Sequence, residues 1–277
     1  MRASRWGNVG YYAAQLLLIV LFAFPLLWVL SLSLKSAAET LESPPSLLPT
    51  SWLWSNYGHV LDTTPLGRYL LNSAVVVAFT VLLTLLLAVP AAYALSRFLF
   101  PGRRTYTRGL LAAQLISPLV IAVPVYRLFI ALGLINNYLG LVLVYTAIVA
   151  PFITWFLKTY LDTLPRELDE AAAIDGCTPA GGMWRVVLPS ARPGIVSAGI
   201  LAGVTAWSQF AIPFILLDDQ ELFPVSVGVV NLKATAGEIT TQYLAAGSVM
   251  AILPVVVIFA VLQRQIVGAL TSGAVKG

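Results

Sequence analysis

The chain has 277 residues, of which 59% are hydrophobic and only 10% are charged. Soluble domains are roughly 45–50% apolar and about 25% charged, so this composition excludes an ordinary soluble domain. The formal net charge of +4 would suggest nucleic-acid binding in a soluble protein. In a membrane chain the positions of the cations matter instead, and no nucleic-acid partner is expected. The one cysteine, Cys177, excludes an intrachain disulfide.

Six uncharged stretches approach or exceed the roughly 20 residues that a helix needs to cross a bilayer. They predict an all-α polytopic membrane protein with a single domain, residues 1–277. The third stretch has only 18 residues (109–126), but Arg127 at its end can extend its charge to the interface. The first is too long for a signal peptide and is expected to be retained. We place the spans at about 10–34, 69–96, 109–132, 138–157, 193–217 and 243–263.

The Lys and Arg residues predict the orientation of these spans. With both termini in the cytoplasm, twelve of the 16 cations lie in inner segments, where the excess is expected. The inner twelve are Arg2, Arg5, Arg97, Arg103, Arg104, Arg108, Lys158, Arg166, Arg185, Arg192, Arg264 and Lys276, and the outer four are Lys35, Arg68, Arg127 and Lys233.

Two longer outer loops, 35–68 and 218–238, carry seven of the chain's 12 carboxylates. They are either contact surfaces for an external partner or solvated connectors. His59 in the first of them is the only histidine of the chain, so no metal site is expected.

One inner connection, residues 158–192, contains signals for the start and the end of helices and is therefore expected to be folded. We call it the coupling loop. We predict a first short helix capped by Asp162 or Thr163 and ended by a left-handed Gly176. A second helix starts at Thr178-Pro179, and Pro189 ends the run. In the first helix, Leu164, Leu168, Ala171 and Ala172 share one side, which permits close approach of another chain. Glu170 lies beside that side, where it can pair with a cation of a docking protein.

The loop resembles the EAA loop of ABC importer permeases of the binding-protein-dependent type. Glu170-Ala171-Ala172 is followed after three residues by Gly176, after nine more by Val186, and then by Leu188-Pro189. Only Val186, which stands for an isoleucine, departs from that pattern. By this resemblance the residues that couple the chain to an ATPase are Leu168, Glu170, Ala171, Ala172, Asp175, Gly176, Leu188 and Pro189.

Further segments resemble the carbohydrate branch of the family, in particular the smaller permease of maltose systems. They are Asn72-Ser73, Ala91-Ala92-Tyr93-Ala94, Phe100-Pro101-Gly102, Asp175-Gly176 and the tail 270–277. The resemblance implies a type I ABC importer permease fold in the bacterial cytoplasmic (inner) membrane. It also implies three kinds of partner: a second, different permease, two copies of a cytoplasmic ATPase, and an extracytoplasmic substrate-binding protein.

The sequence contains no G-x-x-x-x-G-K-[ST] nucleotide loop, so no enzymatic activity is expected. No cofactor is expected on this chain, and ATP and Mg²⁺ are expected on the partner ATPase. A neutral, hydroxyl-rich solute would pass amides, hydroxyls and aromatic faces. Candidate pathway residues are Gln114, Ser117, Asn137, Trp207, Ser208 and Gln209. Hydrogen bonding or packing between helices is the alternative role for them.

The solute itself stays open: a polyol, glycerol phosphate, amino acid or peptide is an alternative to a sugar, and the sequence does not separate the first two of these from sugars. A secondary transporter is the rival class of protein. It would be expected to show internal repeats and ionisable groups within its spans, whereas the span interiors here are almost free of charge.

Overall fold

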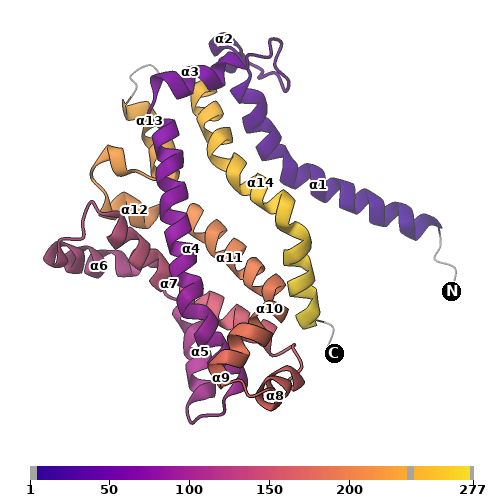
Figure 1. Cartoon of the computed structure of the whole chain (residues 1–277). Helices are drawn as coiled ribbons and strands as arrows, with labels where there is room; N and C mark the ends of the chain where they lie inside the picture. Colours follow the sequence, from indigo (N-terminus) through magenta and orange to yellow (C-terminus); the bar gives the residue numbers. More distant parts are fainter. Residues whose placement is uncertain (1–4, 236–239, 275–277) are drawn as a thin grey trace. The chain divides into compact units, whose positions relative to one another are not determined.

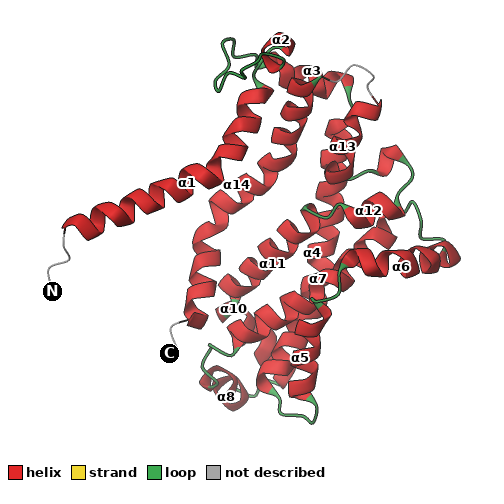
Figure 2. Ribbon diagram, turned by 180° about the vertical axis from the view of Figure 1, so that it is seen from behind, coloured by secondary structure: helices red, strands yellow, loops and turns green. Residues whose placement is uncertain are grey.

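The computed structural model describes residues 5–235 and 240–274, and within them all regular structure is helical (Figures 1 and 2). Residues 1–4, 236–239 and 275–277 lie outside the described residues, so Arg2, Glu238, Lys276 and the end of the tail 270–277 do too. The chain divides into two compact units, residues 1–67 with 228–253 and residues 68–227 with 254–277.

The first unit contains the N-terminal helices and parts of the last two. Its helices are α1 (Arg5–Ser33), α2 (Ala37–Thr40), α3 (Ser55–Thr63), most of α13 (Val225–Thr235) and the first part of α14 (Thr241–Ala274). Within this unit His59 stacks on Tyr243 with a ring-centroid distance of 4.3 Å, which packs α3 against α14.

The second unit contains the coupling loop and nearly all of α4. Its longer helices are α4 (Leu66–Arg97), α5 (Arg103–Ala113), α6 (Pro118–Leu132), α7 (Tyr138–Leu161), α8 (Glu167–Ile174) and α11 (Arg192–Trp207). Its shorter elements are α9 (Pro179–Gly182), the π-helical turn Met183–Val187, α10 (Leu188–Ser190), α12 (Ala211–Leu216) and the 3-10 turn Gln220–Leu222.

Four helical segments are long and apolar enough to cross a membrane, or up to six if two bent helix pairs each count as one span. The four are Ala14–Ser33, Leu66–Arg97, Tyr138–Leu161 and Thr241–Val261, and they agree with predicted spans one, two, four and six. The two bent pairs are Arg103–Ala113 with Pro118–Leu132 and Pro179–Ser190 with Arg192–Trp207.

The predicted span 109–132 is not one straight helix, because α5 and α6 meet at an angle of 93°. The break lies just before Pro118, which has no N–H and disfavours a helical conformation at the preceding residue. Ser117 is accordingly extended, with ψ of 132°, and its Oγ accepts a hydrogen bond from the Leu119 N–H at 3.3 Å. Ser117 therefore caps α6.

The predicted span 193–217 is also divided, into α11 and α12. The Oγ of Ser208 donates to the carbonyl oxygens of Val204 and Thr205, at 3.0 and 3.2 Å, at the end of α11. Pro213 has no N–H for the Gln209 carbonyl, four residues earlier. That carbonyl instead accepts a hydrogen bond from the Ser226 Oγ at 2.7 Å, so the break leaves it satisfied.

Helix α7 is the core of the second unit, and 12 of its 24 residues are buried. Asn137 caps its start, with Oδ1 accepting from the Leu139 N–H at 2.8 Å. Helices α5 and α11 both contact α7. A side chain at Gly194 of α11 would overlap the Tyr160 ring, so glycine permits the close approach of α11 to α7.

In the first unit, Glu39 is a buried carboxylate that organises the loop between α1 and α3. It accepts hydrogen bonds from the N–H groups of Ser36 and Thr50, each at 2.7 Å, and from the Thr50 hydroxyl. The Glu39 N–H in turn donates to the Ser36 Oγ at 3.3 Å, and the two reciprocal bonds form a capping box at the start of α2. These bonds, led by that from the Ser36 N–H, lower the pKa of Glu39 to about 2 from an ordinary value of 4.5.

The lowered pKa of Glu39 predicts a pH dependence of this loop. Because the folded pKa lies below the unfolded one, the stabilisation is complete above about pH 4.5 and is lost as the pH falls toward 2. We expect Glu39→Gln to raise amide hydrogen exchange in residues 36–51 at pH 7, measured by mass spectrometry. The difference between the variant and the wild type should shrink as the pH falls from 4.5 toward 2. Glu42→Gln is the control, and an equal increase there would contradict the assignment.

Candidate functional site: the coupling loop and an adjoining cavity

The two predicted turns within the coupling loop are confirmed. Gly176 is left-handed, with φ of 80°, directly after α8. The Cys177 N–H donates to the Ala172 carbonyl at 2.9 Å and the Gly176 N–H to that of Ala173 at 3.0 Å, which is a Schellman motif. Thr178 then caps α9, its Oγ1 accepting from the Gly181 N–H at 3.1 Å, with Pro179 in the first turn.

The predicted start and end of the loop's helices are wrong. Helix α8 begins at Glu167, and neither Asp162 nor Thr163 caps it, because their side chains bond elsewhere. Asp162 accepts from the Ser96 Oγ, and the Thr163 Oγ1 donates to the Tyr160 carbonyl, both at 2.7 Å. Pro189 does not end the run, which continues through Ser190. The chain turns at Ala191, with a bend of 80° before α11.

Helix α8 has a packed side and an open side. Ala172 is buried, and a Cβ on Gly182 would lie 3.2 Å from its Cβ, so both residues must be small for α9 to pack on α8. Glu170 and Ala171 are exposed, and the Ile174 side chain is 86% exposed. The open side of α8 thus presents a carboxylate, Glu170, and an apolar side chain, Ile174.

The end of the coupling loop lies in the same hydrophobic core as the long helices of the second unit. Val187 and Leu188 are buried there together with Ala92 of α4 and Ile153 and Leu157 of α7. Pro189 is exposed, as are Asp175 and Gly176. A displacement of the loop would therefore disturb the packing of α4 and α7 directly.

A largely buried ion pair ties α8 to the end of α4. Arg97 Nε lies 2.8 Å from Asp169 Oδ2, and the two side chains are 6% and 23% exposed. The Tyr93 hydroxyl donates to Asp169 Oδ1 at 2.7 Å. Both carboxylate oxygens of Asp169 thus have partners one helical turn apart on α4, which holds α8 to that helix.

A second set of polar contacts supports the first. Arg97 Nη2 donates to the Leu164 carbonyl at 3.3 Å. Asp162, which accepts from Ser96, also pairs with Lys158 of α7 at 2.5 Å. The sequence interpretation did not include these contacts. Two residues could have indicated them: Tyr93, which belongs to a segment typical of the family, and Arg97, which lies one helical turn later on the same side of the helix.

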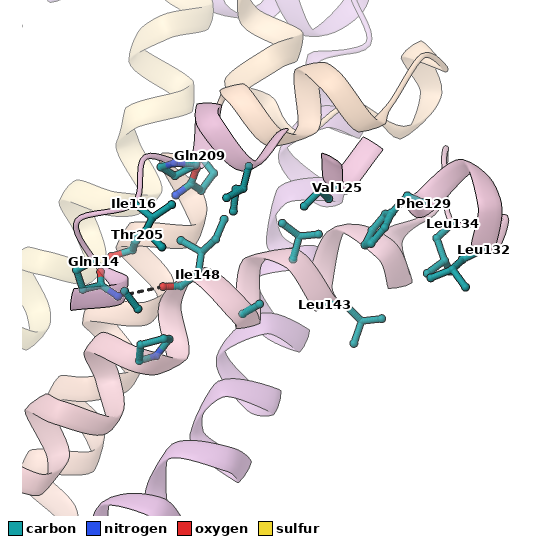
Figure 3. A pocket seen from close by; sticks show the side chains of 16 residues that line it. Gln114, Ile116, Val125, Phe129, Leu132, Leu134, Leu143, Ile148, Thr205 and Gln209 are labelled. Carbon is teal, nitrogen blue, oxygen red and sulfur yellow. Dashed lines mark hydrogen bonds between the residues drawn. The ribbon is translucent and has the colours of Figure 1, made fainter. Parts of the chain in front are cut away.

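A cavity of about 610 Å³ lies in the second unit between α6, α7 and the end of α11 (Figure 3). Most of its lining is apolar, with Val125, Phe129, Leu132, Leu134 and Leu143 at one end. Gln114, Thr205 and Gln209 gather at the other end, which we call the polar end. Gln114 Nε2 donates to the Ile148 carbonyl at 3.4 Å, shown by the dashed line in Figure 3.

The cavity brings together only some of the predicted pathway residues. Gln114 and Gln209 line it, and Thr205, which the sequence interpretation missed, joins them. Ser117, Asn137 and Ser208 do not line it and make the cap and helix-end hydrogen bonds described above, and Trp207 is not among its lining residues. Thr205 could have been found from its position one helical turn before Gln209.

The Asn72-Ser73 pair binds backbone groups within the second unit. Asn72 Nδ2 donates to the carbonyl oxygens of Glu221 and Phe223, at 2.8 and 3.0 Å. The Ser73 Oγ accepts from the Val225 N–H at 2.8 Å. These side chains therefore hold the segment after α12 to the beginning of α4. Among the described residues, no three His, Cys, Asp or Glu side chains gather as metal ligands.

Residues 80–270 match the family described as "Binding-protein-dependent transport system inner membrane component". This chain belongs to that family. It is the inner-membrane permease component of a binding-protein-dependent ABC transporter and spans the membrane several times. The resemblance and the all-helical fold class are thereby confirmed.

Curated relatives match along almost the full chain. The diacetylchitobiose uptake system permease protein NgcG of Streptomyces coelicolor is 35% identical over 96% of this chain and 88% of its own. The trehalose transport system permease protein SugB of Mycobacterium tuberculosis is 31% identical over 96% of this chain and 97% of its own. A chain in the crystal structure of a bacterial ABC transporter involved in import of the acidic polysaccharide alginate shares the fold, with a TM-score of 0.80 at 23% identity. That match covers 95% of this chain and 98% of that one.

The Arg97–Asp169 pair predicts a specific defect. Asp169→Asn leaves the Arg97 cation buried without a counter-charge, which costs up to about 3 kcal/mol. We expect a lower unfolding temperature of the purified permease and loss of ATP-driven uptake. Glu167→Gln on the exposed first turn of α8 is the control and should change neither. Unchanged unfolding temperature and uptake in Asp169→Asn would show that the pair does not hold α8.

Proposed function

We propose that this chain is the membrane-spanning permease subunit of an ABC importer that takes up a sugar or oligosaccharide. Membership in the binding-protein-dependent family supports the transport role. The names of relatives that match nearly the whole chain, for diacetylchitobiose and trehalose systems, support a carbohydrate as the solute. The conclusion depends on one observation. One side of α8 is exposed, while its opposite side is fixed to the long helices.

In the proposed mechanism an ATPase subunit binds the open side of α8. Glu170 supplies a carboxylate for a cation of the ATPase, and Ile174 supplies apolar contact area. Closure of the ATPase pulls on α8, and Asp169 and Leu188 pass the displacement to α4 and α7. The ATPase thus shifts the equilibrium between inward-open and outward-open states through differential contacts.

The chain works without catalysis of its own. ATP and Mg²⁺ bind the ATPase, since the sequence has no phosphate-binding loop. The proposed assembly contains this chain, a second and different permease, two ATPase copies and an extracytoplasmic binding protein. The family description supports the binding protein as a partner. Both termini face the cytoplasm, as the distribution of cations predicts.

We place the solute contact at the polar end of the cavity. Two amides and a hydroxyl, from Gln114, Gln209 and Thr205, suit the hydroxyl groups of a sugar. No charged side chain is among the lining residues of this cavity, in agreement with a neutral solute.

The coupling role predicts the effect of Glu170→Ala. Losing one partner of an interface ion pair costs about 2–5 kcal/mol, so we expect at least a roughly 30-fold lower affinity for the ATPase. The unfolding temperature should not change, because Glu170 is exposed. The measurement is ATPase retention on the immobilised permease, with uptake in proteoliposomes. Glu167→Ala is the matched control, and full ATPase retention by Glu170→Ala would reject the proposed contact.

The solute contact predicts a different pattern. Thr205→Val and Gln209→Leu remove hydrogen-bonding groups with little change of volume, so we expect reduced uptake at normal ATPase binding. Uptake of radiolabelled disaccharides, with binding protein present, is the measurement. Leu132→Met at the apolar end is the control. Normal uptake by both polar-end variants would exclude this end from the pathway.

Ligand binding to the cognate binding protein distinguishes an importer for another solute. A binding protein that binds a polyol or glycerol phosphate, and no sugar, would indicate such an importer. A secondary transporter is distinguished by energy source, since its uptake would continue without ATPase and respond to an ion gradient.

A further inference from the structure

A second cavity, of about 820 Å³, lies in the second unit where α4 connects to α5. Four cationic side chains line it: Arg103, Arg104 and Arg108 of α5, and Lys158 of α7. Leu99 and Phe100 of the connection line it as well. We call it the basic cavity.

No carboxylate among the described residues pairs with any of the three arginines of the basic cavity. In the part of the chain that the structure describes, the ion pairs are Arg68–Glu221, Arg97–Asp169 and Lys158–Asp162. Asp162 thus compensates Lys158 alone, and the arginines carry an uncompensated positive charge. Arg104 and Arg108 are exposed, and Arg103 is half-buried.

The local backbone adds to this positive charge. The basic cavity lies at the beginning of α5, where the helix dipole is positive. Gly102, with φ of 85°, has no side chain to cap the helix, and the first turn of α5 contains no acidic residue. The expected ligand is therefore an anion.

The place of the cavity points to the kind of anion. The connection 98–102 joins two candidate membrane-crossing segments, and the adjacent end of α4 is bonded to the coupling loop. On the orientation proposed above, this is the level of the cytoplasmic headgroups. Leu99 is 83% exposed, and Phe100 and Leu111 are also exposed beside the cations. Apolar groups next to a cationic cluster can contact the acyl chains of a lipid, whereas a soluble anion has no apolar part for them to contact.

We propose that the basic cavity binds the phosphate headgroup of an anionic phospholipid of the cytoplasmic leaflet. Arg104 and Arg108 contact the phosphate oxygens, which the planar guanidinium group can bind in a bidentate manner. Leu99 and Phe100 contact the beginning of the acyl chains. Because Lys158 belongs to α7, a bound lipid bridges α5 and α7 and supports the bent α5–α6 segment.

The test uses the full chain, purified with its natural partners and placed in nanodiscs with phosphatidylglycerol and phosphatidylcholine. Lipid retained after transfer to detergent is counted by native mass spectrometry. Each cation near an anionic headgroup contributes a factor of roughly five, so we expect R104A/R108A to lower phosphatidylglycerol affinity roughly 30-fold. Phosphatidylcholine retention should not change.

The control R185A/R192A removes two exposed cations of the coupling region that do not line the basic cavity. It should retain phosphatidylglycerol like the wild type. An equal loss in the control would show that net charge alone attracts the lipid, and would overturn the proposal.

Two further outcomes would also overturn it. Inorganic phosphate at millimolar concentration should not displace the lipid, and displacement would assign the site to a soluble anion. Loss of the ATPase from R104A/R108A with unchanged lipid retention would assign the arginines to an acidic protein surface. Lipid retention is measured without ATP, so this result does not depend on whether the chain imports a sugar.

Discussion

The second unit depends on how the coupling loop is attached to α4 and α7. Asp169 is bound on both carboxylate oxygens by side chains of α4, one of which is a buried arginine. Val187 and Leu188 at the end of the loop share a hydrophobic core with the same helices. A charge pair with little access to water resists separation, and a close-packed core transmits displacement instead of absorbing it. The open side of α8 is therefore mechanically connected to the helices that are proposed to move.

Polar residues within the apolar segments divide into two groups. Ser117, Asn137 and Ser208 bond to the backbone at helix ends, and Ser226 satisfies the carbonyl that Pro213 leaves free. In a membrane these bonds replace those that water would make. Gln114, Thr205 and Gln209 instead line a cavity, where their polar groups can meet a solute. The breaks in the helices thus both shape the cavity and determine which polar groups reach it.

The charged side chains of Glu39 in the first unit and Arg97 in the second are little exposed to water, and both have polar partners within the protein. Buried Glu39 is held by backbone N–H groups and buried Arg97 by a carboxylate, so neither is left without compensation. By contrast, no carboxylate among the described residues pairs with the exposed Arg104 and Arg108 of the basic cavity. Since compensated charges stabilise a fold and uncompensated ones attract ligands, the basic cavity stands apart from the chain's structural ion pairs.

The sequence by itself determined the class of the protein and the local chemistry of the coupling loop. Apolar stretches of membrane length, the Gly176 stop and the Thr178 cap depend on neighbouring residues, so they could be predicted. Tertiary structure alone decided the contact of Asp162 with Ser96 and that of Asp169 with Arg97, because these partners are more than 60 residues away along the chain. For the same reason Thr205 joined Gln114 only in the folded cavity, and Asn137, predicted for the pathway, acts as a helix cap. Hydropathy and spacing report the environment of a segment, whereas a site between helices depends on which segments pack together.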